Sequence, residues 1–487
     1  MTDKETLPEP DGAPESERCA VPEAHALVLA WSRDEPWRVG QALIVPSQNR
    51  TRTLIWGRGP AGDDVGERIF LQEFRLWRTA ETTPLASASI SRRQLEICAP
   101  SEDSIFVRNV GRCPLLCNGV QVAQAEFRAG DTLQLGKQLL FLVVKRPAFA
   151  AAECPHYPEF EFGDVDPFGI VGESAAVWRL RGQIAFFAPQ DVHLLISGPS
   201  GAGKELVAEA IHSLSQRGHR RMVARNAATL PETLIDAELF GNCRNYPNPG
   251  MADRPGLVGE ASGSTLFLDE IGELPQVSQA HLLRVLDRGE YQRLGEATCR
   301  RADLRVIAAT NRDTSLLKAD LLARLRLRIV VADLNARKED IPLLVRHILR
   351  DRSGDGEEPF LPLATMRTLL ERRYEFNVRE LDSVLRNELA PPDLRLNDHR
   401  ELLPPRERRE ENRTSNSDVW EQTDGEIELT PEKIQRCLDE NNGVLELTWR
   451  ALGLANRFAL LRLVKKHQLE VRRRPGLAQL RRGNAQR

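Results

Sequence analysis

The sequence predicts a multidomain protein in which an all-β sandwich, an α/β domain with a helical lid and a small all-α domain follow one another. Three patterns support this prediction. Short β-type runs separated by turn residues occupy 25–146, which is typical of a sandwich. Strand-type and helix-type segments alternate over 167–335, and only helix-type segments follow over 336–390 and 429–470. The 487 residues suffice for this arrangement, at roughly 100–200 residues per domain.

Four further segments flank or separate these domains. Residues 1–24 are rich in Pro, Glu and Asp, a composition typical of disorder. Residues 147–166 are expected to be a linker, and residues 391–428 a second one that is charged and contains proline. Residues 471–487 form a basic tail.

The sequence shows no feature of export or membrane insertion. Its longest apolar run, residues 139–144, has the length of a strand and not the ~18 residues that span a bilayer. The polar, acidic start lacks the basic region and apolar core of a signal peptide. We therefore expect a cytoplasmic protein without a membrane partner. The eight cysteines lack metal-ligand spacing, so we expect free thiols.

The charge is distributed unevenly. The formal net charge of −3 divides into +8 for residues 429–487, with 13 Lys+Arg against 5 Asp+Glu, and −11 for the residues before them. A basic tail on an acidic body indicates that only the C-terminal part meets a polyanion.

A glycine-rich loop joins a strand-type run at 192–197 to a helix-type run that begins at Lys204. In such a loop, backbone N–H groups converge on phosphate oxygens, the helix N-terminus adds the positive end of its dipole, and the lysine reaches the terminal phosphates. The hydroxyl residue that usually follows the lysine and binds magnesium is replaced here by Glu205, so the metal needs a second acidic site. The predicted phosphate-binding residues are Gly198, Pro199, Ser200, Gly201, Ala202, Gly203, Lys204 and Glu205.

Acidic residues at the end of a later strand supply that second site. The run 265–268 ends in Asp269-Glu270, where the first carboxylate can orient Mg²⁺ and the second can polarise the attacking water. Another strand-type run ends in Thr310-Asn311, a polar tip suited to sensing the terminal phosphate.

Over residues 168–390 the sequence resembles the AAA+ ATPase domain of bacterial enhancer-binding proteins, the activators of sigma-54 RNA polymerase. The resemblance implies ATP and Mg²⁺ as cofactors, ATP hydrolysis, and a homo-oligomer, typically a hexameric ring, because a catalytic arginine comes from the neighbouring subunit. The motifs that carry it are GPSGAGKE (198–205), LPETLIDAELFG (230–241), GSTLFLDEIGELP (263–275), LLRVLDRGEYQRLG (282–295), DLRVIAATNRD (303–313) and NVREL (377–381).

The resemblance also implies roles for individual residues. Lys204 would contact the phosphates, Asp269 would hold magnesium and Glu270 would activate water. Asn226 would restrain Glu270 in a nucleotide-dependent switch. Asn311 would be the first sensor, Arg324 the finger that acts on the neighbouring subunit, and Arg379 the second sensor in the lid.

Three departures from the family pattern stand out. Residues 245–250 read NYPNPG where the family's polymerase-contacting loop reads GAFTGA, so the Phe and Thr that touch sigma-54 are missing. A family arginine six positions before the finger is Lys318, and the Pro-Gly pair that usually precedes Asn377 is absent. The sequence therefore predicts a largely intact nucleotide site with an altered output loop, and argues against RNA polymerase sigma-54 as a direct target.

The N-terminal region resembles a forkhead-associated (FHA) module, which binds phosphothreonine peptides. Gly57-Arg58-Gly59, Ser91-Arg92-Arg93, Asn118-Gly119 and Leu133–Gly136 follow the family order. The resemblance implies a phosphothreonine-containing partner whose phosphate is held by Arg58, Ser91 and Arg92. Gln94 stands in place of the usual His, so an FHA-shaped domain that acts only in dimerisation or autoinhibition remains the alternative.

Residues 429–470 resemble the Fis-type helix–turn–helix of the same activators, with helices expected at 431–440, 446–452 and 456–466. The resemblance implies double-stranded DNA as a partner, and the local positive charge agrees with it. A short basic helical pair without DNA is the alternative. The predicted DNA-contacting residues are Asn456, Arg457, Arg462, Lys465 and Lys466.

Together these patterns predict an ATP-hydrolysing, DNA-binding transcriptional regulator with a phosphate-sensing N-terminal module. Two other functions remain open. One is a regulator that uses ATP-driven assembly on a target other than sigma-54. The other is an adaptor that links a phosphorylated partner to DNA without hydrolysing ATP.

Overall fold

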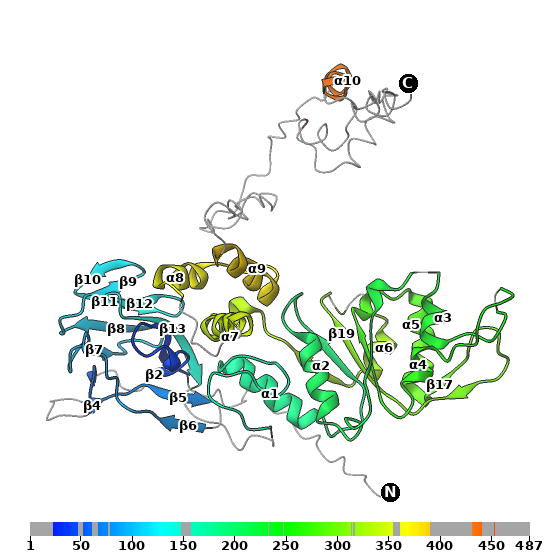
Figure 1. Cartoon of the computed structure of the whole chain (residues 1–487), viewed down its shortest axis with the longest axis horizontal. Helices are drawn as coiled ribbons and strands as arrows, with labels where there is room; N and C mark the ends of the chain where they lie inside the picture. The colour runs from blue at the N-terminus through cyan, green and yellow to red at the C-terminus, as the bar shows by residue number, and fades with distance from the viewer. Residues whose placement is uncertain are drawn as a thin grey trace, which may run out of the picture. The chain divides into compact units, whose positions relative to one another are not determined.

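The structure is a computed structural model, and it describes residues 23–46, 52–60, 67–75, 78–147, 157–231, 233–246, 248–312, 314, 317–353, 361–389, 431–440 and 452 (Figure 1). Residues 1–399 form one compact unit and residues 400–487 a second. No helix in the described ranges combines the length and the apolar composition needed to cross a bilayer.

Two mainly antiparallel sheets form the N-terminal domain, so the all-β prediction for this region is confirmed. A short 3₁₀ helix, η1 (Pro36–Arg38), joins the first two strands. The larger sheet has the order β10 (Val120–Val122), β9 (Leu115–Cys117), β12 (Thr132–Leu135), β13 (Leu139–Pro147), β1 (Glu23–Ser32), β2 (Ala42–Val45), β5 (Gln72–Arg75) and β6 (Arg78–Glu81). The smaller has the order β11 (Gln124–Arg128), β8 (Ser104–Asn109), β7 (Leu95–Cys98), β3 (Leu54–Trp56) and β4 (Glu67–Arg68).

The larger sheet is buried on both faces at its centre. On one face, Leu27 of β1 and Phe141 of β13 belong to the core between the two sheets, where Phe141 meets the ring of Trp56 edge-on at 5.5 Å. On the other face, Ala30 and Leu142 belong to a second apolar cluster that includes helices of the lid. Because successive strand residues point to opposite faces, burial of both faces explains why β1 and β13 read as continuous apolar runs.

A five-stranded parallel sheet forms the centre of the α/β domain, which confirms the predicted alternation of strands and helices (Figure 1). Alternate strand residues enter two cores: Ile196 and Phe267 pack with one group of helices, whereas Leu195 and Leu268 pack with the other. The strand order is β15 (Val223–Asn226), β16 (Thr265–Asp269), β19 (Arg305–Thr310), β14 (Leu194–Ser197) and β20 (Leu327–Val330). The first face carries α1 (Ala175–Phe187) and α2 (Lys204–Ser213); the second carries α3 (Ile235–Phe240), α4 (Gly256–Glu260), α5 (Gln276–Arg288) and α6 (Ala319–Arg324).

The remaining elements of this unit are short connections, a ribbon and the lid. The 3₁₀ turns η2 (Ala227–Thr229) and η3 (Ile271–Glu273) follow β15 and β16, and β17 (Glu290–Tyr291) pairs with β18 (Arg300–Arg301). The lid contains η5 (Leu334–Asp340), α7 (Ile341–Ser353), α8 (Leu363–Glu371) and α9 (Asn377–Leu389), so its predicted helical character is confirmed.

The second unit contains one described helix, α10 (Pro431–Glu440), in which Ile434 and Leu438 are buried. It spans the residues at which the first helix of the predicted helix–turn–helix is expected. Apart from Leu452, the other residues of that prediction lie outside the described part of the chain.

Candidate functional site

A pocket of about 770 Å³ lies at the carboxyl ends of the parallel strands. Because β14, β16 and β19 run in the same direction, Ser197, Asp269 and Thr310 end at one edge of the sheet, where open α/β sheets bind ligands. Residues 200–205 of the predicted phosphate loop line the pocket, and Gly198 and Pro199 bond to its lysine. Other lining residues are Ile170, Val171, Asn226, Asp269, Glu270, Arg337 and Arg379.

Glycines shape the phosphate loop. Gly201 has φ +73°, and a Cβ at this position would lie 2.3 Å from the carbonyl oxygen of Phe376 in the lid. Gly203 has φ +100° and caps α2, whose first residue is Lys204. Only glycine adopts these angles and this close approach without strain. The loop therefore leads directly into a helix N-terminus, as the sequence predicts.

The loop itself orients the side chain of Lys204. The Nζ atom donates hydrogen bonds to the carbonyl oxygens of Gly198 at 3.1 Å and Pro199 at 3.4 Å. It also lies 3.7 Å from Oε1 of Glu270. The ammonium and the carboxylate are thus held on the same side of the pocket.

Asn226 pairs with Asp269 in this structure, and its nucleotide-dependent restraint of Glu270 stays a prediction. Its Nδ2 donates to Oδ2 of Asp269 at 3.0 Å. The strand register explains this hydrogen bond, because Asn226 and Asp269 are direct neighbours on β15 and β16. Glu270 leaves the strand with φ +52°, and its Oε2 accepts the backbone N–H of Asn311 at 3.1 Å.

Asp269 fits the predicted role of metal ligand. Its side chain is buried, and Oδ1 has no hydrogen-bond partner within the described residues. An unpaired buried carboxylate oxygen is costly, and carboxylate oxygens are the ligands that Mg²⁺ prefers in proteins. Asp269 is therefore the residue that would hold a magnesium ion in this pocket.

The lid closes over the phosphate loop through Asn377. The Nδ2 atom donates to the carbonyl oxygen of Ser200 at 3.0 Å, and Oδ1 accepts the N–H of Leu334 at 2.7 Å. Asn377 itself takes the left-handed conformation, with φ +53°, and begins α9. The helix begins at Asn377 although the family's Pro-Gly pair is absent. Arg379, two residues later, lines the pocket as predicted and packs against Gly201.

Arg337 is a pocket residue that the sequence interpretation missed. It lies in η5, is 6% exposed, and donates through Nη2 to the carbonyl oxygen of Ala202 at 3.3 Å. Its Nε atom has no hydrogen-bond partner within the described residues, and burial lowers the pKa of its guanidinium. It belongs to no phosphate motif, and only the predicted junction between the α/β domain and the lid could have indicated it.

Two other predicted residues lie outside the lining of this pocket. Arg324 ends α6 and forms an ion pair with Asp287 of α5, and about half of its side chain is exposed. Asn311 contributes its backbone N–H to Glu270. Among the described residues, neither Arg324 nor Asn311 lines the pocket of its own chain.

The predicted phosphopeptide residues come together at one end of the sandwich. The N–H of Arg58 donates to the carbonyl oxygen of Ser91 at 3.1 Å, and a Cβ on Gly57 would lie 2.2 Å from the carbonyl oxygen of Arg92. The hydroxyl of Ser91 accepts the N–H of Arg112 at 3.0 Å. Arg58 is half-buried, Arg92 is exposed, and Nε of Arg58 has no hydrogen-bond partner within the described residues.

Gln94, which stands in place of the usual His, connects the loops beside this cluster by hydrogen bonds. It is fully buried, and its Oε1 accepts the N–H of Ser91 at 3.0 Å. Its Nε2 donates to Oδ1 of Asn109 at 2.7 Å and to the carbonyl oxygen of Cys113 at 2.8 Å. The substitution of the usual His therefore leaves the loops that carry Ser91 and Cys113 connected.

In the altered output loop, 245–250, the structure describes every residue but 247, and hydrogen bonds within the loop connect its two ends. Asn245 has φ +65°, its N–H donates to the carbonyl oxygen of Met251 at 2.9 Å, and its Oδ1 accepts the N–H of Gly250 at 2.9 Å. At the base, Asn242 is buried, its backbone pairs with Arg254, and its Nδ2 donates to the carbonyl oxygen of Ala252. These bonds hold the described residues of the loop and its base in place, and the side chain of Tyr246 is exposed.

The predicted DNA-contacting residues belong to a part of the chain that the structure does not describe. They are Asn456, Arg457, Arg462, Lys465 and Lys466.

The phosphate loop, the Asp269-Glu270 strand end and the helical lid define an α/β nucleotide-binding domain of the AAA+ class. Residues 170–335 match the family model described as the Sigma-54 interaction domain. The chain is 37% identical to a formate hydrogenlyase transcriptional activator of Salmonella typhimurium, over 67% of this chain and 50% of that protein. It is 40% identical to the transcriptional regulatory protein ZraR of Escherichia coli, over 45% of this chain and 52% of that protein.

Solved structures of one further protein are similar over part of the chain. A crystal structure of NtrX from Brucella abortus in complex with ADP covers 62% of this chain and 70% of that one, with 29% identity and a TM-score of 0.42. The complex of the same protein with ATP gives 28% identity and a TM-score of 0.41, over 62% of this chain and 69% of that one. The chain spans about half the length of the activator and of ZraR.

Proposed function

We propose that this protein is an ATP-dependent, DNA-binding transcriptional regulator whose AAA+ domain hydrolyses ATP. The observation that carries the proposal is the presence, in one pocket, of the Lys204 ammonium and of Oδ1 of Asp269, an oxygen that has no hydrogen-bond partner within the described residues. The Lys204 ammonium supplies a positive charge for the phosphates, and the Asp269 carboxylate supplies an oxygen ligand for Mg²⁺. The descriptions of the relatives as a transcriptional activator and a transcriptional regulatory protein support the regulatory part.

Each of these pocket residues has a separate proposed role in ATP hydrolysis. Magnesium, when bound, would neutralise charge on the phosphates, and Asp269 would hold it. Lys204 would bind the terminal phosphates. Glu270 would orient and polarise the attacking water, and the N–H of Asn311 already fixes the direction of its carboxylate.

Hydrolysis is proposed to require a homo-oligomer, with a hexameric ring as the expected form. A loose phosphoryl-transfer transition state gains stabilisation from an arginine, and in this proposal Arg324 of a neighbouring subunit supplies it. The exposure of Arg324 outside its own pocket supports this role.

Phosphate release from Mg-ATP tests the proposal directly. Turnover per chain should rise with protein concentration, since neighbouring subunits complete the site. Lys204→Ala should abolish nucleotide binding, whereas Glu270→Gln should bind nucleotide and lose turnover. Glu260→Gln, an exposed carboxylate on α4, is the matched control and should behave as the wild type. Wild-type protein that lacks nucleotide binding would contradict the proposal.

The flanking domains are proposed to bind a phosphorylated partner and DNA. The sandwich would bind a phosphothreonine-containing partner through Arg58, Ser91 and Arg92, which lie together at its end. Residues 429–470 would bind double-stranded DNA through the predicted recognition helix, and the charge of +8 over residues 429–487 supports this.

The target of the output loop is proposed to differ from that of ordinary sigma-54 activators. The sequence at 245–250 lacks the Phe-Thr pair and has an exposed Tyr246 one position earlier, and hydrogen bonds of Asn245 hold the described part of the loop. A regulator acting on another target fits this loop, although residues 170–335 match the Sigma-54 interaction domain.

A non-hydrolysing adaptor is the second candidate. It would bind ATP only to stabilise the assembly while linking a phosphorylated partner to DNA. Binding without any turnover at concentrations that support assembly would favour it over the regulator, but the presence of Glu270 beside Lys204 favours hydrolysis.

A further inference from the structure

The outer face of the larger sandwich sheet is covered by the helical lid of the same unit. The indole Nε1 of Trp31 on β1 donates to the carbonyl oxygen of Leu361 at 2.7 Å, just before α8. Leu140 and Leu142 of β13 belong to one apolar cluster with lid residues such as Leu343. The sandwich and the lid therefore share a continuous buried core.

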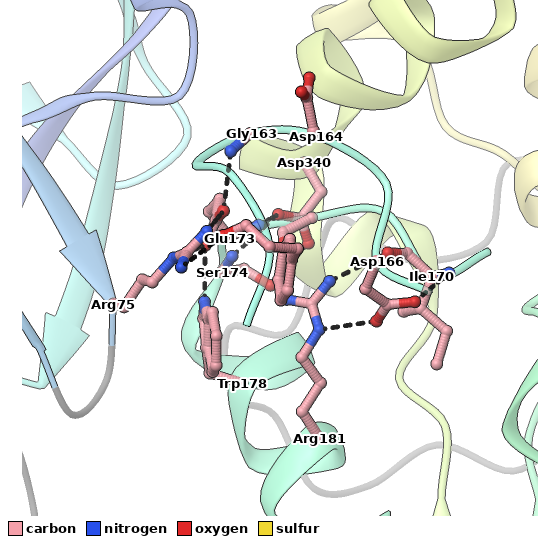
Figure 2. Close-up of polar contacts among 12 residues, drawn as sticks. Arg75, Gly163, Asp164, Asp166, Ile170, Glu173, Ser174, Trp178, Arg181 and Asp340 are labelled. Atoms are coloured by element: carbon pink, nitrogen blue, oxygen red, sulfur yellow. Dashed lines mark hydrogen bonds and ion pairs between the residues drawn. The ribbon is translucent and has the colours of Figure 1, made fainter. Parts of the chain in front are cut away.

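Two ion pairs join the sandwich to buried carboxylates, one in the lid and one in the segment before α1. Nε of Arg146, at the end of β13, donates to Oε2 of Glu339 at 2.7 Å, and the two side chains are 2% and 9% exposed. Arg75, at the end of β5, donates through Nε and Nη2 to the two carboxylate oxygens of Glu173 at 3.2 and 3.0 Å (Figure 2). The guanidinium of Arg75 also lies 4.5 Å from the ring centroid of Phe160.

The two carboxylates meet at a single junction. Glu339 precedes Asp340, and the backbone N–H groups of Glu173 and Ser174 donate to Oδ1 of Asp340 at 2.8 and 2.9 Å. The hydroxyl of Ser174 donates to its Oδ2 at 2.6 Å (Figure 2). A Cβ on Gly172 would lie 2.7 Å from the Asp340 carboxylate, so the two segments are packed without spare room.

This junction continues directly into the nucleotide pocket. On one side, Ile170 and Val171 precede Glu173 by only a few residues and line the pocket. Arg181 secures that segment by donating to the carbonyl oxygen of Ile170 at 2.9 Å. On the other side, Arg337 lies two residues before Glu339 and lines the same pocket.

We infer that Arg75 and Arg146 are positioning residues through which the sandwich fixes the nucleotide pocket. This inference rests on the proposed nucleotide binding and extends it to a part of the chain that touches no nucleotide. Each arginine neutralises a buried carboxylate, and its removal leaves that charge uncompensated. The pocket segments beside Glu173 and Glu339 then lose their fixed position, so nucleotide binds more weakly. By reciprocity, nucleotide binding strengthens the docking of the sandwich.

A fluorescent nucleotide titration of the full chain tests the inference. With mant-ADP as the probe, Arg75→Ala and Arg146→Ala should each raise Kd by at least about five-fold, the lower end of typical coupling. In steady-state hydrolysis the same variants should raise KM more than they lower kcat. Arg75→Lys and Arg146→Lys, which keep the charge, should recover part of the affinity.

Arg108→Ala is the matched control. Arg108 donates to Glu96 at 2.9 Å, but it lies on β8 of the smaller sheet, so removal of its ion pair should leave Kd unchanged. If Arg75→Ala and Arg146→Ala also bind mant-ADP with wild-type Kd, the inference is wrong. If wild-type protein does not bind the probe, the proposed nucleotide binding itself is wrong. The two failures can therefore be distinguished.

A measurement on the wild type avoids variants that fail to fold. Hydrogen exchange of the backbone amides in residues 72–75 and 142–146 should slow when mant-ADP is added, because nucleotide strengthens the docking. Slower exchange in the phosphate loop with no change in these two strands would overturn the inference.

Discussion

The side-chain amide of Asn377 in the lid donates a 3.0 Å hydrogen bond to the carbonyl oxygen of Ser200 in the phosphate loop. Its Oδ1 accepts from Leu334 at the start of the lid, so one buried side chain joins the loop to two separate segments of the lid. The position of Arg379 over the pocket depends on this connection, because it lies in the first turn of the helix that Asn377 begins.

Replacing Asn377 should therefore loosen the lid and weaken nucleotide binding. Asn377→Ala leaves the N–H of Leu334 and the carbonyl oxygen of Ser200 without their partner, at a cost of about 1–3 kcal/mol for a buried group. It also places alanine at φ +53°. Asn377→Gly removes the same hydrogen bonds without that backbone strain. Nucleotide titration should show weaker binding for both variants; unchanged affinity in both would contradict this role of the side chain.

Stability should fall in mild acid because of His193. Its Nδ1 accepts the N–H of Val306 at 3.0 Å, so Nε2 carries the proton and donates to the carbonyl oxygen of Leu286 at 3.1 Å. Burial lowers the pKa of His193 below its usual 6.5. The unfolded chain therefore binds more protons in this range, and the stabilisation present above about pH 6.5 is lost as pH falls through the folded-state pKa.

Thermal melts between about pH 7.5 and pH 5 should show this loss in the wild type and a flatter profile in His193→Gln. The variant profile should not be completely flat, since burial also lowers the pKa of His25 in the sandwich. A profile for His193→Gln that coincides with the wild type would exclude His193 as the source.

The sandwich should distinguish a phosphothreonine peptide from its unphosphorylated form. Arg58 is half-buried and its backbone bonds to Ser91, so we expect its guanidinium to donate to a phosphate bound beside Ser91. In fluorescence anisotropy with the full chain, Arg58→Ala should erase the difference, whereas Arg128→Ala on β11 should retain it. Equal affinity for both peptide forms across a varied library would instead favour a dimerisation or autoinhibitory module.

DNA binding should depend on residues 429–487. Their deletion should eliminate binding, and the affinity of the intact chain should fall steeply with salt because phosphate contacts release counterions. Arg457→Ala and Lys465→Ala should each weaken binding and reduce the salt slope by about 0.9 for every phosphate that the variant no longer neutralises. A truncated chain that shifts the same DNA equally well would show that the DNA site is elsewhere.

The local features of the nucleotide site could be predicted because each depends on a short stretch of sequence. The strand at 194–197, its glycine-rich turn and α2 follow one another within 20 residues, and Asp269 comes directly at the end of β16. Lys204, Asp269 and Arg379 all line the pocket as expected. Parallel strand direction alone brings these separate segments to one edge of the sheet.

Other contacts depend on packing between distant segments and could not be predicted. The bond from Asn226 to Asp269 follows from the register of β15 and β16, which the sequence does not specify. Arg75 and Glu173 are 98 positions apart, and no motif connects them. The apolar runs of β1 and β13 indicated burial, but only the structure shows that the lid covers their second face.

In the proposed function, residues 245–250 determine which target the ATPase acts on. Pro249 removes a backbone donor from the turn, and the bonds of Asn245 hold its shape. The Phe-Thr pair that would provide much of the binding energy in a small interface is missing from the sequence, and the exposed aromatic residue of the loop, Tyr246, stands one position before the place of the Phe. Replacement of residues 245–250 by the sequence GAFTGA should therefore increase ATP-dependent binding to sigma-54.

Open-complex formation by sigma-54 holoenzyme, measured in the same reaction as phosphate release, tests the account most directly. With wild-type protein and Mg-ATP, we expect phosphate release that Glu270→Gln abolishes, together with little or no open complex at a sigma-54 promoter. Robust ATP-dependent open complexes would contradict the proposed separation from sigma-54, and the absence of phosphate release at concentrations that support assembly would contradict the proposed ATPase.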